Sequence, residues 1–427
     1  MCHWGRTILA MAIYYIDPEK GTNENDARSV ASPGKDWKNL KLFPGDTVLF
    51  RRSCVIRGSI DSPAGAEGAP ITWGAYGEGD APQFRGSVSL ADPSGWKETE
   101  PNVWMWDRPL PSEPGNLIFD GTSCGTLRWT REELENPGDW WDSGFGKTEQ
   151  LHQKRDPNDR LYLCCRKNPA LCWKEMEAAL YADRVLAKAP AHVVFRDLAF
   201  WGSGVHGFAA AEAEDITIEN CTFSFIGGMV WNKDLKIRFG NGAEFWNGAR
   251  HILIQNCVFR DIYDSCFTHQ GSMPFPAPED VTFTGCICER YGMAAYEVRD
   301  IMPCHTVFSK NICRDAGVGF AMQGETLPRR SEIWPQPMGH HLFIWRIEHA
   351  TPNGEIRVEE NQFEAAPNGS TLYSIVSPAA EEQFRFSGNR VTPVTAQSFY
   401  WKGAYRQVLD FEPGSWIMSQ EGLEWQK

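Results

Sequence analysis

Residues 252–259, ILIQNCVF, decide the fold, because their pattern returns along the central third of the chain. Related segments begin at residue 216 (ITIENCTF), 281 (VTFTGCIC) and 306 (TVFSKNIC), and looser copies begin at 193, 356 and 384. Each segment is a short alternating strand, a polar turn residue and a second short strand. A strand-rich repeat without helical periodicity is typical of a parallel β-solenoid, so the sequence predicts an all-β fold.

The turn residues mark the period of this repeat. Asparagine and aspartate suit tight corners, because their side chains bond locally and tolerate unusual backbone dihedrals. Asparagines at equivalent corners can also stack on one another as a ladder between coils. The markers, at intervals of 23, 36, 29 and 26 residues, are Asp197, Asn220, Asn256, Gly285 and Asn311.

Composition narrows the range of partners. The 427-residue chain is 42% hydrophobic, enough for a large core, and its formal net charge is −13. It has no long basic run, so we expect neither nucleic acid nor an anionic membrane as a partner. Its 18 tryptophans fit either the filling of a core or platforms on which sugar rings stack.

The cysteines are predicted to be thiols. Thirteen is an odd number, so at least one has no partner within the chain. Cys221, Cys257 and Cys286 occupy matching positions of successive repeats, which favours small buried side chains over a disulfide framework. Many unpaired cysteines fit a cytoplasmic protein. The N-terminus lacks the full apolar core of a signal peptide, and no apolar run is as long as a membrane span.

The repeat divides the chain into four regions. Residues 1–92 are predicted to form an N-terminal cap and the first coils, and residues 191–325 the central coils. Residues 93–190 are rich in tryptophan and interrupt the pattern as an insertion or as lateral loops. Residues 326–427 are expected to form C-terminal coils and a cap. The histidine pair at 340–341 lacks spaced carboxylates, so no metal site is predicted.

Side-chain directions follow from the register of the repeat. The residue eleven positions after each marker is large and apolar or aromatic, so this column is predicted to face inward. Strand alternation turns the next position outward. The inward column contains Phe208, Phe267, Tyr296 and Met322; the outward columns contain Ala209, Thr268, Glu297 and Gln323, then Ala211, Gln270, Arg299 and Glu325.

The coil with the longest step has to be aligned by pattern. In GAEFWNG, residues 242–248, Ala243 and Phe245 are predicted to face inward. Glu244 and Trp246 then face outward, in the same columns as Thr268 and Gln270.

A polar cluster follows in NCVFRDIYDSCFTHQG, residues 256–271, where Asp264, Thr268, His269 and Gln270 lie within seven positions. The segment is predicted to be an exposed strand with its approach turn. A solvated surface is one interpretation. The predicted face, however, combines acidic groups with Arg, Gln, His and Trp and contains no Lys, which favours a functional cleft.

Four segments carry a resemblance to known proteins. They are YYIDPEKGTN (14–23), FPGDTVLFRRS (43–53), GAPITWGAYGEGDAP (68–82) and FGNGAEFWNGARHILIQNCVFRDIYDSCFTHQG (239–271). With them the chain resembles the right-handed parallel β-helix carbohydrate-active proteins. This group is related in fold to pectate lyases and includes β-helical glycoside hydrolases acting on fucosides or xylans. The resemblance spans roughly residues 13–325 and implies a right-handed β-helix that binds carbohydrate along one sheet, with a periplasmic or secreted location open.

The resemblance also implies catalytic residues. It points to Glu244 in GAEFW and Asp264 in IYDSCFTHQG, and more loosely to Glu297 in AAYEVRD. Hydrolysis needs a carboxylic acid that protonates the leaving oxygen and a carboxylate that acts as nucleophile or as base for water. Two coils at a spacing of about 4.8 Å would separate the backbones of Glu244 and Glu297 by about 9.6 Å. An ion pair between one of these carboxylates and Arg250 or Arg299 is the alternative.

Further side chains near this face are candidates for binding sugar. Tryptophan can stack on a ring, and the polar groups can bond to hydroxyls. The predicted substrate-binding residues are Trp246, Thr268, Gln270, His206, His269, Arg299, Trp201 and Trp231.

Two other functions remain open. A polysaccharide lyase or uronate epimerase needs a base for the proton alpha to a uronate carboxylate, and Ca²⁺, Arg or Lys to neutralise that group. Arg299 keeps this alternative open, whereas the acid-rich face without Lys favours hydrolysis. A non-catalytic glycan-binding solenoid is the second alternative. For the hydrolase we expect an oligosaccharide or polysaccharide as partner and no cofactor.

Overall fold

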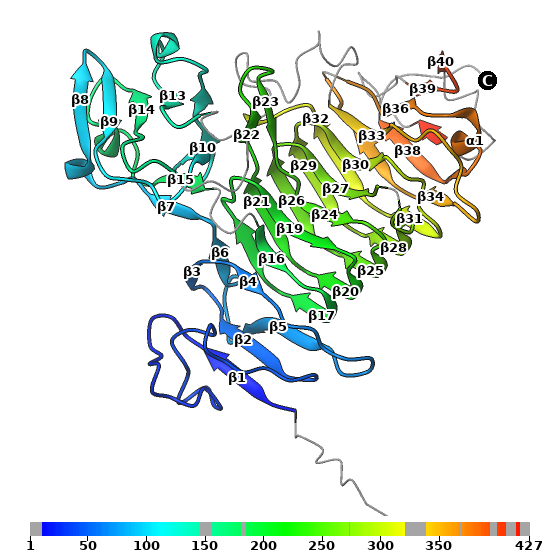
Figure 1. Ribbon diagram of the computed structural model, residues 1–427, viewed down its shortest axis with the longest axis horizontal. Helices are drawn as coiled ribbons and strands as arrows, with labels where there is room; N and C mark the ends of the chain where they lie inside the picture. The colour runs from blue at the N-terminus through cyan, green and yellow to red at the C-terminus, as the bar shows by residue number, and fades with distance from the viewer. Residues whose placement is uncertain are drawn as a thin grey trace, which may run out of the picture.

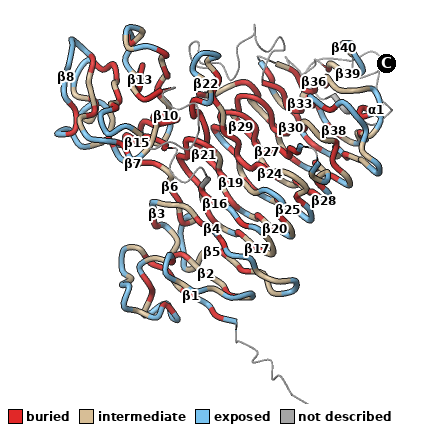
Figure 2. The backbone as a smooth tube through the Cα atoms, in the orientation of Figure 1, coloured by how far each residue is buried: buried red, intermediate tan, exposed pale blue. Residues whose placement is uncertain are grey.

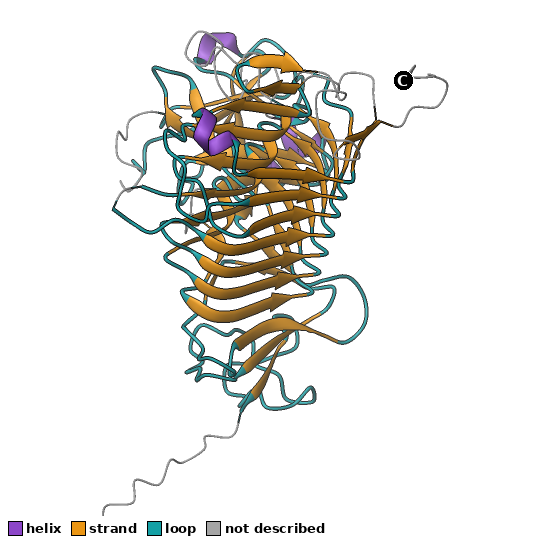
Figure 3. Ribbon diagram, turned by 90° about the vertical axis from the view of Figure 1, so that its right-hand side faces the viewer, coloured by secondary structure: helices purple, strands orange, loops and turns teal. Residues whose placement is uncertain are grey.

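The computed structural model describes residues 11–145, 155–180, 185–272, 274–320, 339–367, 369–392, 399–406 and 416–418. Within them, three ten-stranded sheets wind around a common interior as a right-handed parallel β-helix (Figures 1 and 3). The strands pair in parallel from coil to coil, apart from the final antiparallel pair of sheet 2. The predicted all-β solenoid is confirmed.

The strands of the three sheets follow one another along the chain. Sheet 1 comprises β1 (Ile13–Ile16), β2 (Thr47–Arg51), β5 (Ile71–Tyr76), β17 (Ala191–Arg196), β20 (Glu214–Glu219), β25 (Arg250–Gln255), β28 (Glu279–Thr284), β31 (Thr306–Ser309), β34 (Ile356–Glu359) and β37 (Phe384–Ser387). Sheet 2 comprises β4 (Ile60–Asp61), β16 (Val185–Lys188), β19 (His206–Ala211), β24 (Ala243–Trp246), β27 (Ser265–Gln270), β30 (Ala294–Arg299), β33 (His340–Trp345), β36 (Leu372–Ile375), β39 (Phe399–Trp401) and β40 (Ala404–Arg406). Sheet 3 comprises β3 (Val55–Arg57), β6 (Gln83–Arg85), β18 (Ala199–Trp201), β21 (Thr222–Ile226), β26 (Val258–Ile262), β29 (Ile287–Tyr291), β32 (Ile312–Ala316), β35 (Gln362–Glu364), β38 (Asn389–Thr392) and β41 (Trp416–Met418).

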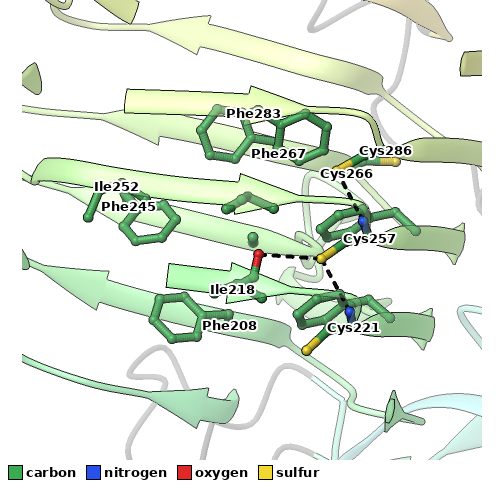
Figure 4. Packing of buried hydrophobic residues seen from close by; sticks show 14 of the residues in the cluster. Phe208, Ile218, Cys221, Phe245, Ile252, Cys257, Cys266, Phe267, Phe283 and Cys286 are labelled. Carbon is green, nitrogen blue, oxygen red and sulfur yellow. Dashed lines mark hydrogen bonds between the residues drawn. The ribbon is translucent and has the colours of Figure 1, made fainter. Parts of the chain in front are cut away.

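Columns of apolar side chains fill the interior. Phe208, Ala243, Phe267 and Tyr296 lie side by side on successive strands of sheet 2, as the register predicted, and all are buried. The Phe267 and Tyr296 rings stack with centroids 5.3 Å apart, close to the strand spacing of about 4.8 Å. Figure 4 shows such columns from close by, and Figure 2 shows that exposed residues concentrate in the connecting loops. Each coil thus buries its apolar face against the next.

The corners between sheets 1 and 3 require a left-handed backbone. Asp197, Asn220, Asn256 and Gly285 have φ angles of 57°, 52°, 53° and 65°, which confirms their predicted role as turn residues. Such angles are tolerated by Gly, Asn and Asp at low cost. At the next corner the left-handed residue is Lys310 (φ 57°), so the predicted marker Asn311 lies one position too late.

Asn311 belongs instead to a ladder that runs just behind these corners. Its side-chain amide donates to Oδ1 of Asn361 at 3.0 Å, and the Asn361 amide donates to Oδ1 of Asn389 at 2.9 Å. Toward the N-terminus the ladder continues in cysteines, since the N–H of Cys286 donates to Asn311 and that of Cys257 to the Cys286 sulfur. These thiols are buried, as predicted (Figure 4). Asn and Cys therefore satisfy backbone groups that each corner leaves unpaired.

Residues 87–180 leave the coils and form a lateral subdomain, seen at the upper left of Figure 1. Its described strands form a four-stranded and a five-stranded sheet. The four-stranded sheet comprises β11 (Ser123–Cys124), β10 (Pro114–Phe119), β15 (Met176–Leu180) and β7 (Ser87–Ser89). The five-stranded sheet comprises β12 (Thr126–Leu127), β13 (Asp139–Asp142), β14 (Leu161–Cys164), β9 (Val103–Trp106) and β8 (Trp96–Glu100).

This subdomain has a core of its own. Trp96, Trp106, Trp129 and Trp140 are buried in it together, so these tryptophans fill a core. Short 3₁₀ helices lie at Pro93–Gly95 (η1), Arg131–Glu133 (η2) and Pro169–Leu171 (η3). Compared with the predicted insertion at 93–190, the subdomain begins earlier, because β7 pairs with β15, and ends earlier, because β16 returns to sheet 2.

Two smaller elements complete the described fold. A hairpin of β22 (Met229–Asn232) and β23 (Ile237–Phe239) interrupts the coil with the longest step. The short helix α1 (Pro378–Glu381) lies near the C-terminal end and is capped by the hydroxyl of Ser377. Within the described residues, β34 to β39 continue the coils toward the C-terminus.

The ladder makes Asn361 a test of coil stacking. We expect N361A to lower the free energy of unfolding by roughly 3 kcal/mol or more, because it leaves several buried donors and acceptors without partners. Denaturant unfolding followed by circular dichroism measures the change. N23A, at an exposed turn position, is the control and should change stability little; equal effects of both variants would contradict a ladder role.

Candidate active site

The outer face of sheet 2 brings the predicted carboxylates into one column. Ala209, Glu244, Thr268 and Glu297 are direct neighbours on β19, β24, β27 and β30, as the register predicted. Phe343 of β33 is the next neighbour of Glu297. The residues expected beyond Tyr296, Glu297 and Arg299 in their columns, which are Met322, Gln323 and Glu325, lie outside the described residues.

A second outward column runs beside the first. Trp246 lies between Ala211 and Gln270, and Arg299 lies next to Trp345. The Arg299 guanidinium is 5.7 Å from the centroid of the Trp246 ring and 5.5 Å from that of Trp345. This arrangement is typical of cation–π contacts, and it couples side chains from three coils.

The carboxylates are buried. Glu244 exposes 2% of its surface, Asp264 2% and Glu297 0%, and every residue of β27 is buried. The prediction of an exposed strand at this position is therefore wrong. Strand spacing explains the difference, because outward side chains only about 4.8 Å apart cover one another when some are as large as Trp345.

Glu244 is held by two neighbours. Its Oε2 atom is 2.9 Å from Nδ1 of His206 and accepts a hydrogen bond of 3.1 Å from the Asn241 side chain. Burial raises the pKa of Glu244, but the charge and hydrogen bond of His206, the Asn241 amide and the charge of Arg299 outweigh burial and lower it below its ordinary value. Glu244 is consequently a carboxylate at neutral pH.

His206 can serve Glu244 only when Nδ1 carries a proton. The backbone N–H of Asn241 also points to this nitrogen, at 3.1 Å. A neutral Nδ1 without a proton accepts from Asn241, whereas a protonated Nδ1 donates to Glu244. The presence or absence of a proton on Nδ1 therefore decides which of the two contacts is a hydrogen bond.

Asp264 is fixed by the turn that precedes β24. The N–H of Gly240 donates to Oδ2 of Asp264 at 3.1 Å, and the N–H of Asp264 donates back to the Gly240 carbonyl at 3.0 Å. Gly240 has φ 142°, and a Cβ there would lie 2.3 Å from the Cα of Gly227. Only glycine fits this position, so the turn holds the Asp264 carboxylate toward the coil of Glu244.

Asn241 and Ser265 connect the carboxylates. Oδ1 of Asn241 accepts from the N–H of Ser265 at 3.0 Å, and the Ser265 hydroxyl donates to Oε2 of Glu297 at 3.0 Å. The other oxygen of Glu297 accepts from the Trp345 indole at 2.8 Å. A chain of hydrogen bonds therefore runs from Glu244 through Asn241 and Ser265 to Glu297.

Sequence reasoning missed these connecting residues. The GNG run at 240–242 was a signal for a tight turn before Glu244, whereas nothing in the sequence distinguishes Ser265 or Trp345. Arg250 and Arg299 were the alternative ion-pair partners for the candidate carboxylates, but each pairs with another residue. Arg250 pairs with Glu214 at 2.7 Å, and Arg299 pairs with Asp300 at 3.0 Å.

The remaining predicted residues divide into two groups. Thr268 and Gln270 lie on the same face as the carboxylates, and the Gln270 amide donates to the Thr268 hydroxyl at 3.3 Å. Trp201 is buried on sheet 3 against Ile118, Ala179 and Phe225, and Trp231 is 54% exposed on the hairpin. Neither tryptophan is brought to the carboxylates by a described contact.

His269 faces the interior. Its Nε2 atom forms a hydrogen bond with the Tyr296 hydroxyl, and its ring packs edge-on against Phe267. Burial lowers the pKa of His269 to about 3. This position is not on the predicted sugar-binding face, because alternation along β27 places His269 on the side opposite Thr268.

Arg238 of β23, a residue that no sequence pattern singles out, supports the site from the hairpin. It is buried, its guanidinium lies 4.5 Å from the centroid of the Tyr263 ring, and it donates to the carbonyls of Gly228 and Gly115. Gly115 belongs to the lateral subdomain, and Tyr263 directly precedes Asp264. Arg238 thus ties the hairpin and the lateral subdomain to the strand that carries the site.

The described residues also bear on metal binding and on membrane insertion. Among these residues, no three His, Cys, Asp or Glu side chains are grouped so that they could hold a metal ion. None of the helices in the same part of the chain has the length and apolar character needed to cross a membrane.

Comparison with known proteins finds no matching family model and no matching curated protein. Among solved structures, a glycoside hydrolase matches with a TM-score of 0.51 and 11% identity, over 89% of this chain and 92% of that one. A lacto-N-biosidase from Eubacterium ramulus matches with a TM-score of 0.48 and 13% identity, over 89% of this chain but only 64% of that one. A pectate lyase matches with a TM-score of 0.48 and 13% identity, over 93% and 73%. The match to the glycoside hydrolase supports the parallel β-helix fold that the strand pairing of this chain shows.

The inward histidines predict how stability depends on pH. His269 and His341 both have a pKa near 3 when folded, against an ordinary value of 6.5. As the pH falls below 6.5 the unfolded chain binds these protons first, so each histidine lowers the free energy of unfolding by up to about 1.4 kcal/mol per pH unit. We expect H269Q to show a shallower loss of stability between pH 6.5 and 4 in denaturant titrations. H349Q, at an exposed histidine, should keep the wild-type slope; an unchanged slope in H269Q would contradict the assignment.

Proposed function

We propose that the protein is a glycoside hydrolase that cleaves a glycosidic bond in an oligosaccharide or polysaccharide by paired-carboxylate catalysis. The observation that carries this proposal is the network on sheet 2. Glu244, Asp264 and Glu297 come from three successive coils and are linked there through Gly240, Asn241 and Ser265. Such carboxylates, fixed by hydrogen bonds in a water-poor environment, are the groups that glycoside hydrolysis requires.

The environments of the carboxylates suggest separate roles. The lowered pKa of Glu244, caused by His206, Asn241 and Arg299 against the effect of burial, suits the ionised partner that acts as nucleophile or base. The proton donor is then Asp264 or Glu297. The backbones of Glu244 and Glu297 are two strand spacings apart, about 9.6 Å, which favours an inverting pair with carboxyl groups roughly 6.5–9.5 Å apart. Asp264 lies one coil from Glu244 and would make a closer pair.

Sugar binding is assigned to the neighbouring column. The Trp246 side chain is only partly buried, so one part of its ring remains for stacking on a sugar. Gln270 lies beside it and carries an amide suited to hydroxyl groups. Because Glu244 and Glu297 are buried, this proposal requires the outward side chains above them to move when substrate enters.

A lyase or epimerase is less well supported. In that chemistry a cation must neutralise the uronate carboxylate. Arg299 is the candidate, but it already pairs with Asp300, and the charges of Glu297 and Glu244 also act on it and help to raise its pKa against burial. An additional carboxylate from the substrate would enter an acidic environment, which favours uncharged sugars.

Substitution of the carboxylates tests the proposal. With a panel of glycans, we expect the wild type to release reducing ends, and E244Q, D264N and E297Q each to lower the rate by roughly 10²–10⁴-fold, because each removes a proton-transferring or nucleophilic group. E279Q, at an exposed glutamate of sheet 1, is the matched control.

The products distinguish the three functions. Appearance of an unsaturated product by ultraviolet absorbance would establish the lyase instead. Glycan binding without turnover in the wild type would establish the non-catalytic solenoid. Full activity in all three carboxylate variants would refute the assigned residues.

The pair of His206 and Glu244 predicts a pH effect. In H206Q the protonated imidazole no longer opposes the effect of burial, so the pKa of Glu244 should rise. The acidic limb of the kcat/KM profile should therefore move to higher pH than in the wild type. H349Q should leave the limb in place, and a shift of H206Q to lower pH would contradict an ionised Glu244.

A further inference from the structure

We infer that Cys165 and Cys172 form a redox-active dithiol whose disulfide closes the loop between β14 and η3 of the lateral subdomain. Their sulfur atoms lie 2.9 Å apart, closer than two sulfurs that are merely in contact. Cys172 is exposed, whereas Cys165 is buried. The pair therefore combines an exposed thiol, which can react with a disulfide from solution, with a buried thiol. The buried thiol is close enough to displace the group that the exposed sulfur has gained.

The surrounding contacts hold the two thiols in place. Cys165 directly follows β14, where its N–H donates to the Asn102 carbonyl at 2.8 Å and its own carbonyl accepts from the Trp104 indole at 3.0 Å. The loop is fixed further along by Asn168, whose amide donates to the Pro93 carbonyl at 2.9 Å. Cys165 is thus anchored to the five-stranded sheet.

The other thiol is held at the end of η3, next to a residue that packs on the four-stranded sheet. Cys172 ends η3, where its N–H donates to the Pro169 carbonyl. Trp173, the next residue, stacks on Phe119 of β10 with ring centroids 4.1 Å apart. A bond between the sulfurs therefore closes the loop of residues 165–172, which lies within the segment that leads from β14 to β15.

The chemistry is thiol–disulfide exchange with a small disulfide such as oxidised glutathione. The Cys172 thiolate attacks one glutathione sulfur, and the glutathione disulfide breaks and releases one glutathione. The Cys165 thiolate then attacks the Cys172 sulfur and releases the second glutathione. Two protein thiols are oxidised, one glutathione disulfide is reduced to two thiols, and the protons of the cysteines pass to the released glutathione.

The order of these steps follows from exposure. Burial and the neighbouring Cys172 raise the pKa of Cys165 to about 11, so Cys165 is the slower nucleophile and closes the ring in the second step. Ring closure should accelerate as the pH rises.

Peptide mapping of the folded full-length protein tests the inference. After incubation with oxidised glutathione, trapping of remaining thiols and digestion with trypsin, cleavage after Arg166 and Lys167 separates LYLCCR (161–166) from NPALCWK (168–174). We expect these two peptides to be joined, with the loss of two hydrogen atoms in mass. The joined species should persist in C164S and in C304S and be absent from C165S and C172S.

Two results would overturn the inference. One is a wild type in which Cys172 carries glutathione but remains unjoined to the first peptide, even at alkaline pH. The other is a cross-link that survives in C165S at the wild-type yield, which would assign the bond to Cys164. Circular dichroism of each serine variant establishes that it is folded, so an absent cross-link reports on the missing thiol.

Discussion

In-register parallel pairing between coils is the constraint on which this structure depends. Each strand hydrogen-bonds to the equivalent strand one coil away, so a residue type placed at one position stacks on the same position of the next coil. The left-handed corners at Asn220 and Asn256 keep that register from one coil to the next. Behind them, the cysteine and asparagine ladder satisfies the backbone donors that would otherwise be buried without partners.

The same constraint assembles the candidate site. Glu244 and Glu297 are 53 residues apart in the sequence, yet two strand spacings apart in space. Buried carboxylates on adjacent coils need hydrogen-bond donors, because isolated charges are costly to remove from water. Asn241, Ser265, His206 and the Trp345 indole supply these donors. The residues of the candidate site therefore also form hydrogen bonds that hold neighbouring coils together.

The register, and with it the column of Glu244, Thr268 and Glu297, could be predicted from the sequence because alternation and corner spacing are local signals. Burial could not, since it depends on which large side chains neighbouring coils place outward, such as Trp345. His269 shows the same limit. A histidine beside polar residues suggested sugar binding, but the alternation of side chains along β27 turns His269 into the interior of the β-helix. The coil after β30 was misaligned because its sheet-2 strand begins only at His340, far beyond the expected spacing. The connecting hydrogen bonds of Ser265 require coordinates.

Two insertions interrupt the coils within the described residues, and both contact the Arg238 side chain beside the candidate site. The lateral subdomain supplies the Gly115 carbonyl and the hairpin supplies Arg238, whose guanidinium lies over Tyr263 beside Asp264. A buried guanidinium that bonds to two carbonyls from different segments fixes those segments relative to each other. Any cross-link that stiffens the lateral subdomain, such as one at Cys165, therefore acts on a body directly attached to the strand of Asp264. Under the proposed function, these two insertions are the described parts expected to influence which sugar reaches the carboxylates, because loops and insertions beside a rigid scaffold commonly determine binding.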